Sequence, residues 1–236
     1  MSPNSTLHRT RARRLACTLV VADPVYQPHL CVDLNALFRH RPFQGADPQG
    51  ARYVFVGLDA NYDANLELSS SYSSVLEYHA DGVAFWQRYG VHHPFLLPSY
   101  RGDGRRYHLN FAKIGFAPAD ADSVSFIELL HVPTVGRSKL ESTDLDKQHL
   151  DRINSLITAG DVRRVFVSAG VVRLMLATKA FPWQKPTSPS QELLPILHAC
   201  GRTQVHLHLH FSNYGKFQTQ LDREAHAIAR IIGRDG

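Results

Sequence analysis

Cysteine is scarce in this chain, and Cys17, Cys31 and Cys200 are odd in number and far apart. They form neither a Cys-x-x-Cys pair nor a disulfide framework, which predicts a cytoplasmic protein. No apolar stretch approaches the roughly 20 residues that a membrane span needs. The apolar run Leu15–Ala22 is interrupted and has no convincing cleavage pattern, so it does not predict an export signal. We therefore expect no membrane partner.

Basic residues exceed acidic ones, with 26 Lys+Arg against 21 Asp+Glu and a net charge of +5. They cluster between Arg9 and Arg14, between Arg101 and Arg106, and at Arg137 and Lys139. Such a balance permits a polyanionic partner such as DNA. A solvated basic surface is the alternative interpretation of the same clusters.

The 236 residues suit one domain, expected to be monomeric, with residues 1–45 as a basic arm and lead-in and residues 46–236 as the domain. Apolar runs rich in β-branched and aromatic residues predict four buried strands: Tyr53–Val56, Val124–Leu130, Val162–Val167 and Val205–Phe211. Helical patterns separate or follow them: Gly82–Tyr89, Tyr107–Phe116, Leu145–Ala159, Val171–Lys179, and a final helix with Phe217, Leu221, Ile228 and Ile232 on one side.

Strands that alternate with helices predict an α/β fold, specifically a three-layer α/β/α arrangement around a central four-stranded parallel sheet. The serine-rich segment Leu66–Ser74 is expected to be a mobile loop, and Trp183–Ser190 a surface loop. In such folds ligands bind outside the carboxyl ends of the strands. The residues that directly follow each strand are therefore the candidate site.

Two polar clusters follow strands. Gly57-Leu58-Asp59-Ala60-Asn61-Tyr62-Asp63 follows the first, and His210-Phe211-Ser212-Asn213-Tyr214-Gly215 follows the fourth. We expect adjacent strand ends to face Asp59 towards His210. The alternative for each rim residue, above all Asp63 and Asn213, is a cap or a satisfied loop residue.

The first cluster resembles the Gly-x-Asp-Pro-Tyr motif of uracil-DNA glycosylases, and His-Phe-Ser-Asn resembles their His-Pro-Ser-x motif. The order and spacing are similar too, and the resemblance covers roughly Ala51–Gly233. It implies a monofunctional DNA glycosylase that needs no metal or organic cofactor and binds DNA, either single-stranded or double-stranded with one flipped nucleotide. The sequence departs from the family at Ala60-Asn61, where the family has Pro-Tyr, and this change leaves room for a substituent on base carbon 5.

The resemblance implies a role for each residue. Asp59 orients the attacking water and stabilises the cationic sugar, with Asn61 and Asp63 as further catalytic candidates, and His210 donates a hydrogen bond to the departing base. Ser212 positions a phosphate, while the segment from Asn213 through Tyr214 to Lys216 holds or wedges the duplex. Arg101, Arg105 and Arg106 suit backbone contact, although an exposed loop explains them as well. Tyr62 and Tyr72 are candidates for base contact; Phe85 and Trp86 are better explained as core.

The family's base-reading asparagine aligns with Glu128. An ionised glutamate only accepts hydrogen bonds, so it suits the amino group of cytosine. Together with the opened pocket, this predicts excision of a 5-modified cytosine, hydroxymethylated or glycosylated, from phage DNA, and hence antiviral defence. The alternative for Glu128 is a charge paired with a nearby Arg or His. The alternative functions are uracil or mismatch repair, and a non-catalytic DNA-binding module on the same fold.

Two further patterns have simpler explanations. His206, His208 and His210 alternate along the predicted fourth strand and would share a face, which is a metal-binding geometry. No partner ligand has a convincing spacing, so we expect no metal and interpret them as satisfied polar residues. Ser168-Ala169-Gly170 offers backbone N–H groups to an anion, or is only a tight turn.

Overall fold

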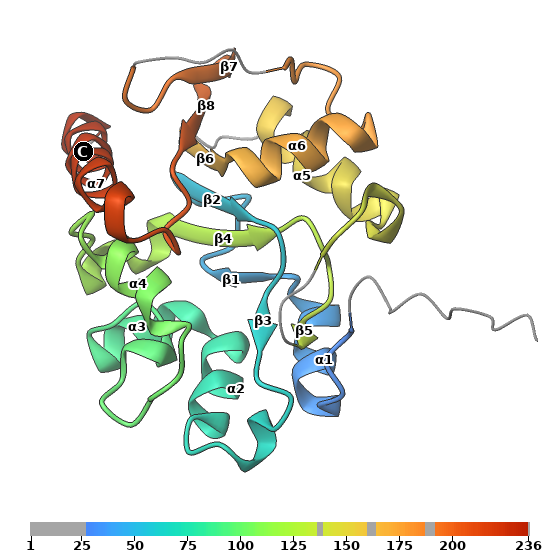
Figure 1. Ribbon diagram of the computed structural model, residues 1–236, viewed down its shortest axis with the longest axis vertical. Helices are drawn as coiled ribbons and strands as arrows, with labels where there is room; N and C mark the ends of the chain where they lie inside the picture. Colours follow the sequence, from blue (N-terminus) through green and yellow to red (C-terminus); the bar gives the residue numbers. More distant parts are fainter. Residues whose placement is uncertain (1–26, 136–138, 160–163, 187–191, 236) are drawn as a thin grey trace, which may run out of the picture.

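The structure is a computed structural model that describes residues 27–135, 139–159, 164–186 and 192–235 (Figure 1). The basic segment Arg9–Arg14, the interrupted apolar run Leu15–Ala22 and Arg137 lie outside the described residues. The described residues form these α-helices: α1 (Val32–His40), α2 (Tyr72–Ala80), α3 (Gly82–Tyr89), α4 (Arg105–Ala112), α5 (Lys147–Ala159), α6 (Ala169–Thr178) and α7 (Gln218–Asp235). Short 3-10 helices also occur: η1 (Leu66–Leu68), η2 (Pro94–Leu96), η3 (Pro118–Ser123), η4 (Ser142–Asp144) and η5 (Gly215–Phe217).

The protein is a mixed α/β structure built on a six-stranded, mostly parallel sheet. The strands are β1 (Phe43–Gly45), β2 (Tyr53–Gly57), β4 (Val124–Glu128), β6 (Arg164–Ser168), β7 (Ile196–Cys200) and β8 (Thr203–His208). Their order is β1-β4-β2-β6-β8-β7. The four predicted strands are β4, β2, β6 and β8, which pair in parallel, but the predicted sheet of four strands is too small. Antiparallel β1 and β7 extend its two edges.

Alternating side chains of the central strands divide the core in two. In β2, Val54 and Val56 join an aliphatic cluster with α5 and α6, whereas Tyr53 and Phe55 join an aromatic cluster with α3, α4 and α7. Because successive strand residues point to opposite faces, each face of the sheet packs on helices (Figure 1). No helix among the described residues combines the length and the apolar character needed to cross a bilayer.

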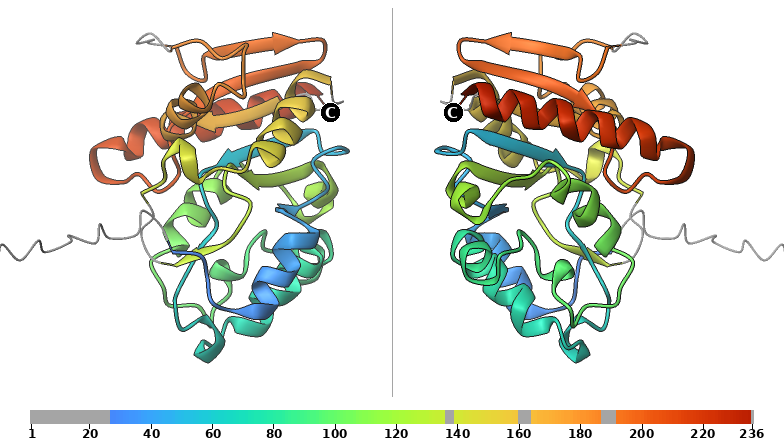
Figure 2. Two further views of the ribbon diagram at one scale, coloured as in Figure 1. Left: turned by 90° about the vertical axis from the view of Figure 1, so that its right-hand side faces the viewer. Right: turned by 90° about the vertical axis from the view of Figure 1, so that its left-hand side faces the viewer.

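A third apolar cluster lies beside the sheet and contains α1, α2 and the two-stranded sheet of β3 (Asn61–Tyr62) and β5 (Thr134–Val135). These elements gather at one end of the molecule (Figures 1 and 2). Residues expected only as a lead-in take part here, since α1 packs in this cluster and β1 pairs with β4. Pro28 also bridges Thr134. The chain from residue 28 onward is thus integral to the fold.

Some predicted bounds are wrong. Leu66–Ser74 is not one continuous loop, because it contains η1 and the first turn of α2, which buries Val75, Tyr78 and His79 on one face. The helix Gly82–Tyr89 is confirmed, with Asp81 accepting from Ala84 N–H at its start and Gly90 in the left-handed region (φ 70°) at its end. The last parallel strand ends at His208, so His210 lies in the turn that follows it.

Candidate functional site

The parallel strands bring their carboxyl ends to one edge of the sheet. Gly57 of β2 is opposite Glu128 of β4, and Ser168 of β6 is opposite His208 of β8. The expected adjacency of the two polar clusters is wrong, because β6 separates β2 from β8. At about 4.8 Å per strand, the two strand ends are about 10 Å apart.

Asp59 is half-buried after β2 and is held by Thr134, a residue that the sequence did not single out. Thr134 Oγ1 donates to Asp59 Oδ2 at 2.5 Å and accepts from Asn61 Nδ2 at 3.1 Å. Thr134 is fully buried, and its backbone N–H donates to Ala60 O at 2.9 Å. A buried hydroxyl with two defined partners fixes the Asp59 carboxylate in one orientation. Thr134 lies shortly after the second predicted strand, Val124–Leu130, and this position near a strand end is the sequence signal that could have identified it.

Asn61 and Asp63 have other tasks. The side-chain amide of Asn61 donates a hydrogen bond to the Thr134 hydroxyl. Asp63 is exposed, and its Oδ1 accepts from the Asn65 N–H at 2.8 Å, which is an Asx turn. His29 Nε2 lies 2.9 Å from the Asp63 carbonyl and ties the turn to the chain before α1. Of the three candidates for holding water, Asp59 is the carboxylate whose side chain is oriented by a buried donor.

His210 is half-buried beyond β8, and its protonation can be assigned from its contacts. The Ser212 backbone N–H donates to His210 Nδ1 at 3.3 Å, and Ser212 Oγ lies 2.6 Å from the same nitrogen. Since Nδ1 accepts, the proton of the neutral ring is on Nε2. Burial lowers the pKa of His210, while the charge of Asp59 opposes that shift. The imidazole is therefore neutral at pH 7 and offers Nε2–H as a donor.

Asp59 acts electrostatically on two groups from different strands. Its charge adds to the rise that burial causes in the pKa of Glu128, and it partly offsets the lowering that burial causes in the pKa of His210. Such effects require that the two groups lie no farther apart than about one Debye length. At this edge of the sheet, Glu128 and His210 therefore each lie within electrostatic range of Asp59.

Glu128 ends β4, and its carboxyl lies directly over Gly57. A Cβ at Gly57 would be only 1.9 Å from Glu128 Oε2, so any larger residue there would displace the Glu128 carboxyl. Burial, and then the charge of Asp59, raises the pKa of Glu128 to about 8. The expectation that Glu128 is ionised is therefore wrong at neutral pH. His149 Nε2 binds the Glu128 backbone oxygen at 2.8 Å, not the carboxyl, so this histidine does not supply the expected charge pair.

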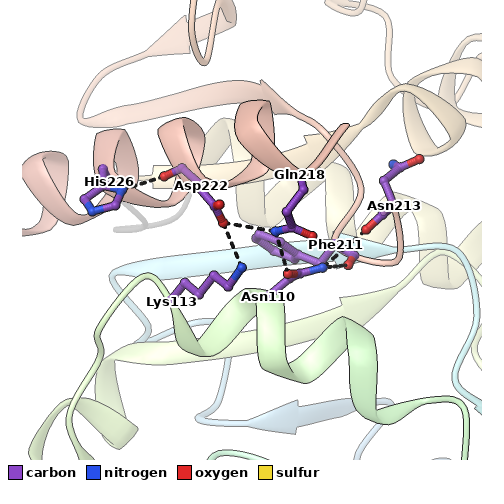
Figure 3. Close-up of polar contacts among 7 residues, drawn as sticks. All are labelled: Asn110, Lys113, Phe211, Asn213, Gln218, Asp222 and His226. Atoms are coloured by element: carbon purple, nitrogen blue, oxygen red, sulfur yellow. Dashed lines mark hydrogen bonds and ion pairs between the residues drawn. The ribbon is translucent and has the colours of Figure 1, made fainter. Parts of the chain in front are cut away.

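The turn that carries His210 is anchored by α4. Asn110 Nδ2 donates to Phe211 O at 2.7 Å and to Asn213 O at 3.3 Å, and Asn110 Oδ1 accepts from Gln218 of α7 (Figure 3). Asn213 Nδ2 donates to the His210 carbonyl at 2.8 Å. This bond matches the alternative interpretation of Asn213 as a cap, and its contact with the duplex stays a prediction. Asn110, which is buried, was missed because it lies in a helix and outside any strand end.

Residues expected to bind DNA come together around the same turn. The Arg106 guanidinium lies 4.4 Å from the centre of the exposed Tyr214 ring, which is a cation–π contact. Lys216 is exposed and its Nζ lies 5.1 Å from the Phe217 ring. Ser212 is exposed as well, although its hydroxyl contacts His210. We group these exposed residues of α4 and of the chain after β8 under the name Arg106–Tyr214 surface, defined as Arg106, Ser212, Tyr214, Lys216 and Phe217.

Arg101 and Arg105 do not belong to that surface by any contact. Arg101 donates to the carbonyls of Pro98 and Tyr100. Arg105 is half-buried and donates to the Leu97 carbonyl at 3.4 Å and to that of Tyr100 at 3.5 Å. Both guanidinium groups therefore bind the chain between η2 and α4, which fixes the start of α4.

The aromatic residues expected to contact the base, Tyr62 and Tyr72, bind other side chains of the protein. Tyr62 is buried, and its hydroxyl lies 2.5 Å from His79 Nε2 in the third cluster. Tyr72 donates to Asp33 of α1 at 2.8 Å. Phe85 and Trp86 are core residues, as the helical pattern indicated. Tyr107, which the sequence indicated as the start of a helix, lies with its ring centre 5.4 Å from that of His210.

The histidines near β8 do not form a shared ligand set. His206 Nδ1 lies 3.1 Å from Leu194 O, and His208 Nδ1 lies 2.9 Å from Leu209 O. Burial lowers the pKa of His208 to about 3. Within the described part of the chain, no three His, Cys, Asp or Glu side chains are grouped as metal ligands would be. At the β6–α6 turn, a Cβ on Gly170 would meet Leu58 at 3.6 Å, so this turn packs against the segment after β2.

Hollows of about 500 Å³ occur elsewhere on the molecule. One is lined by Leu194, Ile196 and Arg230 beside β7 and α7, and another by Thr143, Lys147 and Thr178 beside α5 and α6. Neither contains the polar groups that gather at the strand ends.

The sequence matches no protein-family model and no curated protein. The chemistry of the strand-end residues therefore carries the functional proposal.

Proposed function

We propose that this chain is a monofunctional DNA glycosylase, a divergent member of the uracil-DNA glycosylase superfamily. The observation that carries the proposal is that an oriented carboxylate, Asp59, and a neutral histidine, His210, both lie at the carboxyl edge of one parallel sheet, where the charge of Asp59 acts on the pKa of His210. Helices packed on both faces of that sheet fit the three-layer arrangement that the superfamily requires.

The two groups suit the two charges of N-glycosidic cleavage. As the C1′–N1 bond breaks, the sugar becomes cationic and the base anionic. Asp59 stabilises the cation and accepts a proton from the attacking water, while His210 Nε2–H donates to the base oxygen. Donors and charges fixed before the reaction lower the barrier because they need no reorganisation. The buried hydroxyl of Thr134 and the backbone N–H of Ser212 provide that fixation.

The Arg106–Tyr214 surface is the proposed contact with DNA. A guanidinium and an exposed aromatic ring suit a phosphate and an unstacked base, respectively. The surface is joined to His210 through the turn that Asn110 anchors. Binding of the duplex and extraction of the base are thereby coupled to the position of the proton donor.

The proposed substrate is a 5-modified cytosine, as found in phage DNA, and the proposed role is antiviral defence. Glu128 supports cytosine recognition, since a protonated carboxyl presents an O–H donor and a C=O acceptor side by side. These match N3 and the 4-amino group of cytosine. Uracil or mismatch excision is a second candidate, because the same pair also matches the N3–H and O4 of uracil.

A panel of oligonucleotides tests the proposal. Single- and double-stranded DNA, each with one uracil, thymine mismatch, cytosine, 5-hydroxymethylcytosine or glucosylated 5-hydroxymethylcytosine, is incubated with the protein, and freed bases are identified by mass spectrometry. We expect release of the 5-modified cytosines and alkali-labile abasic sites. Release of uracil alone would defeat the proposed substrate, and release of no base would defeat the glycosylase proposal.

A further inference from the structure

The Glu128 carboxyl has no polar partner in the described part of the chain. No hydrogen bond or ion pair of its Oε1 or Oε2 is found there, although the side chain is more than half buried. It lies against the bare Cα of Gly57, whose missing Cβ makes the space for it. Because the side chain is only partly buried, the carboxyl is free to bind solvent or a ligand at the strand ends.

The titratable groups that are coupled electrostatically to Glu128 come from the segment after β2, from β3, and from two helices. They are the carboxylate of Asp59 and the phenols of Tyr62 in β3, Tyr78 in α2 and Tyr107 in α4. None of these groups is a cation. Burial, and then the charge of Asp59, raises the pKa of Glu128 to about 8, and burial is also the main cause of the raised pKa values of the three phenols. Glu128 therefore keeps its proton at neutral pH.

Asp59 and Glu128 are thus two carboxyl groups in different environments. One is held by a donor at 2.5 Å from Thr134, and the other has no donor and faces a negative charge. A pair of carboxyl groups divided in this way is the usual arrangement of an acid and a base in one site.

We propose that Glu128 is a second catalytic residue, which donates its proton to ring nitrogen N3 of a flipped cytosine-type base as the glycosidic bond breaks. This inference rests on the proposed glycosylase function and goes beyond base recognition by the same side chain. Cytosine has more need of it than uracil, because its anion has one carbonyl oxygen over which to spread charge, whereas that of uracil has two.

The step balances in atoms and charge. The C1′–N1 bond breaks and its electron pair goes to N1, while the Glu128 O–H proton moves to N3, so the base leaves as a neutral tautomer of the cytosine. A water oxygen forms the new bond to C1′, and its proton goes to Asp59. Glu128 is left as a carboxylate and regains a proton from solvent, to which Asp59 returns its own.

The test compares wild type with Glu128→Gln, which keeps the shape, one donor and one acceptor but cannot transfer a proton. Single-turnover release of 5-hydroxymethylcytosine is measured from pH 6 to 10, together with the Kd for the same oligonucleotide. We expect the variant to be slower by about 10²–10⁴-fold, with a Kd within about threefold. The wild-type rate should fall as pH rises above about 8, and this fall should be absent in Glu128→Gln.

Glu67→Gln, an exposed carboxyl in η1, is the matched control and should behave as wild type. A Glu128→Gln rate within threefold of wild type, or the same fall in rate at high pH, would overturn the proposal while leaving the glycosylase function intact. No base release by wild type from any oligonucleotide would overturn both. Carbon-13 NMR of the Glu128 carboxyl decides independently of the variant's folding: a titration midpoint near 8 is expected, and one near 4.5 would contradict the proposal.

Discussion

The hydroxyl of Thr134, a buried residue of β5, donates to the carboxylate of Asp59 at 2.5 Å. It also accepts from Asn61, so removal of this one oxygen frees both neighbours. The three residues form a chain in which Thr134 positions the side chain that we propose holds the attacking water.

Thr134→Val should therefore slow base release without preventing folding. The isosteric methyl keeps the packing but removes the donor, and a loosely held carboxylate is expected to cost about tenfold or more in rate. Single-turnover kinetics measure the loss, and Thr134→Ser, which restores the hydroxyl, should recover most of it. Equal rates for the valine and serine variants would show that the hydroxyl does not position Asp59.

Asp59→Asn should reduce base release by at least about 10²-fold, because the negative charge opposite the sugar is lost. DNA binding should stay within threefold of wild type in a fluorescence anisotropy titration. Asp63→Asn is the matched control, since that exposed carboxyl only accepts from Asn65 N–H. If Asp63→Asn were the slow variant and Asp59→Asn the normal one, the assignment of the water-holding residue would be reversed. Lack of activity in all proteins with intact DNA binding would favour a binding module.

The Arg106–Tyr214 surface predicts two separable effects on DNA affinity. Arg106→Gln should reduce the slope of log K against log salt by about one, because one phosphate contact is removed. Tyr214→Ala should weaken binding by about 1–3 kcal/mol at all salt concentrations, through loss of stacking. Arg39→Gln on the exposed side of α1 is the control. An unchanged salt slope for Arg106→Gln would place the duplex elsewhere.

The sequence predicted the four central strands of the sheet because each is a mostly buried, mostly apolar run. The four strands at the centre of the sheet are buried runs such as Tyr53–Gly57, which local composition identifies. The edges were missed for physical reasons: Phe43–Gly45 has only three residues, and Ile196–Cys200 is partly exposed with polar members. Neither carries a clear period of two.

The candidate site was predicted in part. Asp59 and His210 follow strands, and the topology rule brings such residues to one edge. The protonation of Glu128 could not be predicted, because it depends on burial and on Asp59 through the β2–β4 register. The role of Tyr62 was wrong because its partner, His79, is set by tertiary contacts, and such contacts also give Asn213 its bond to the His210 carbonyl.

Buried histidines predict acid sensitivity of the fold. Burial lowers the pKa of His79 and of His92 from 6.5 to about 3, and that of His108 also falls. As pH falls below about 6.5, these histidines take up protons in the unfolded chain before they do so in the folded protein. The free energy of unfolding is therefore highest above about pH 6.5 and decreases progressively towards pH 3. The free energy of unfolding should fall by about 1 kcal/mol per histidine for each pH unit below 6.5.

Urea denaturation at pH 7.0 and 5.5 measures this loss. His92→Phe keeps an aromatic ring between Trp86 and Phe111. Its unfolding should take up as much as one proton less, so its free energy of unfolding should depend less on pH than that of wild type. His40→Gln at an exposed position should leave the pH dependence unchanged. A free energy of unfolding that is equal at the two pH values would contradict the neutral, buried state of these rings.

The most direct test of the central claim, that Asp59 and His210 belong to one site, is a nitrogen-15 NMR titration of the His210 ring in wild type and in Asp59→Asn. We expect the neutral ring to carry its proton on Nε2, and its pKa to fall further in Asp59→Asn, since the carboxylate that raises it is gone. Asp63→Asn should leave that pKa unchanged. A His210 pKa that is the same in wild type and in Asp59→Asn would contradict the claim.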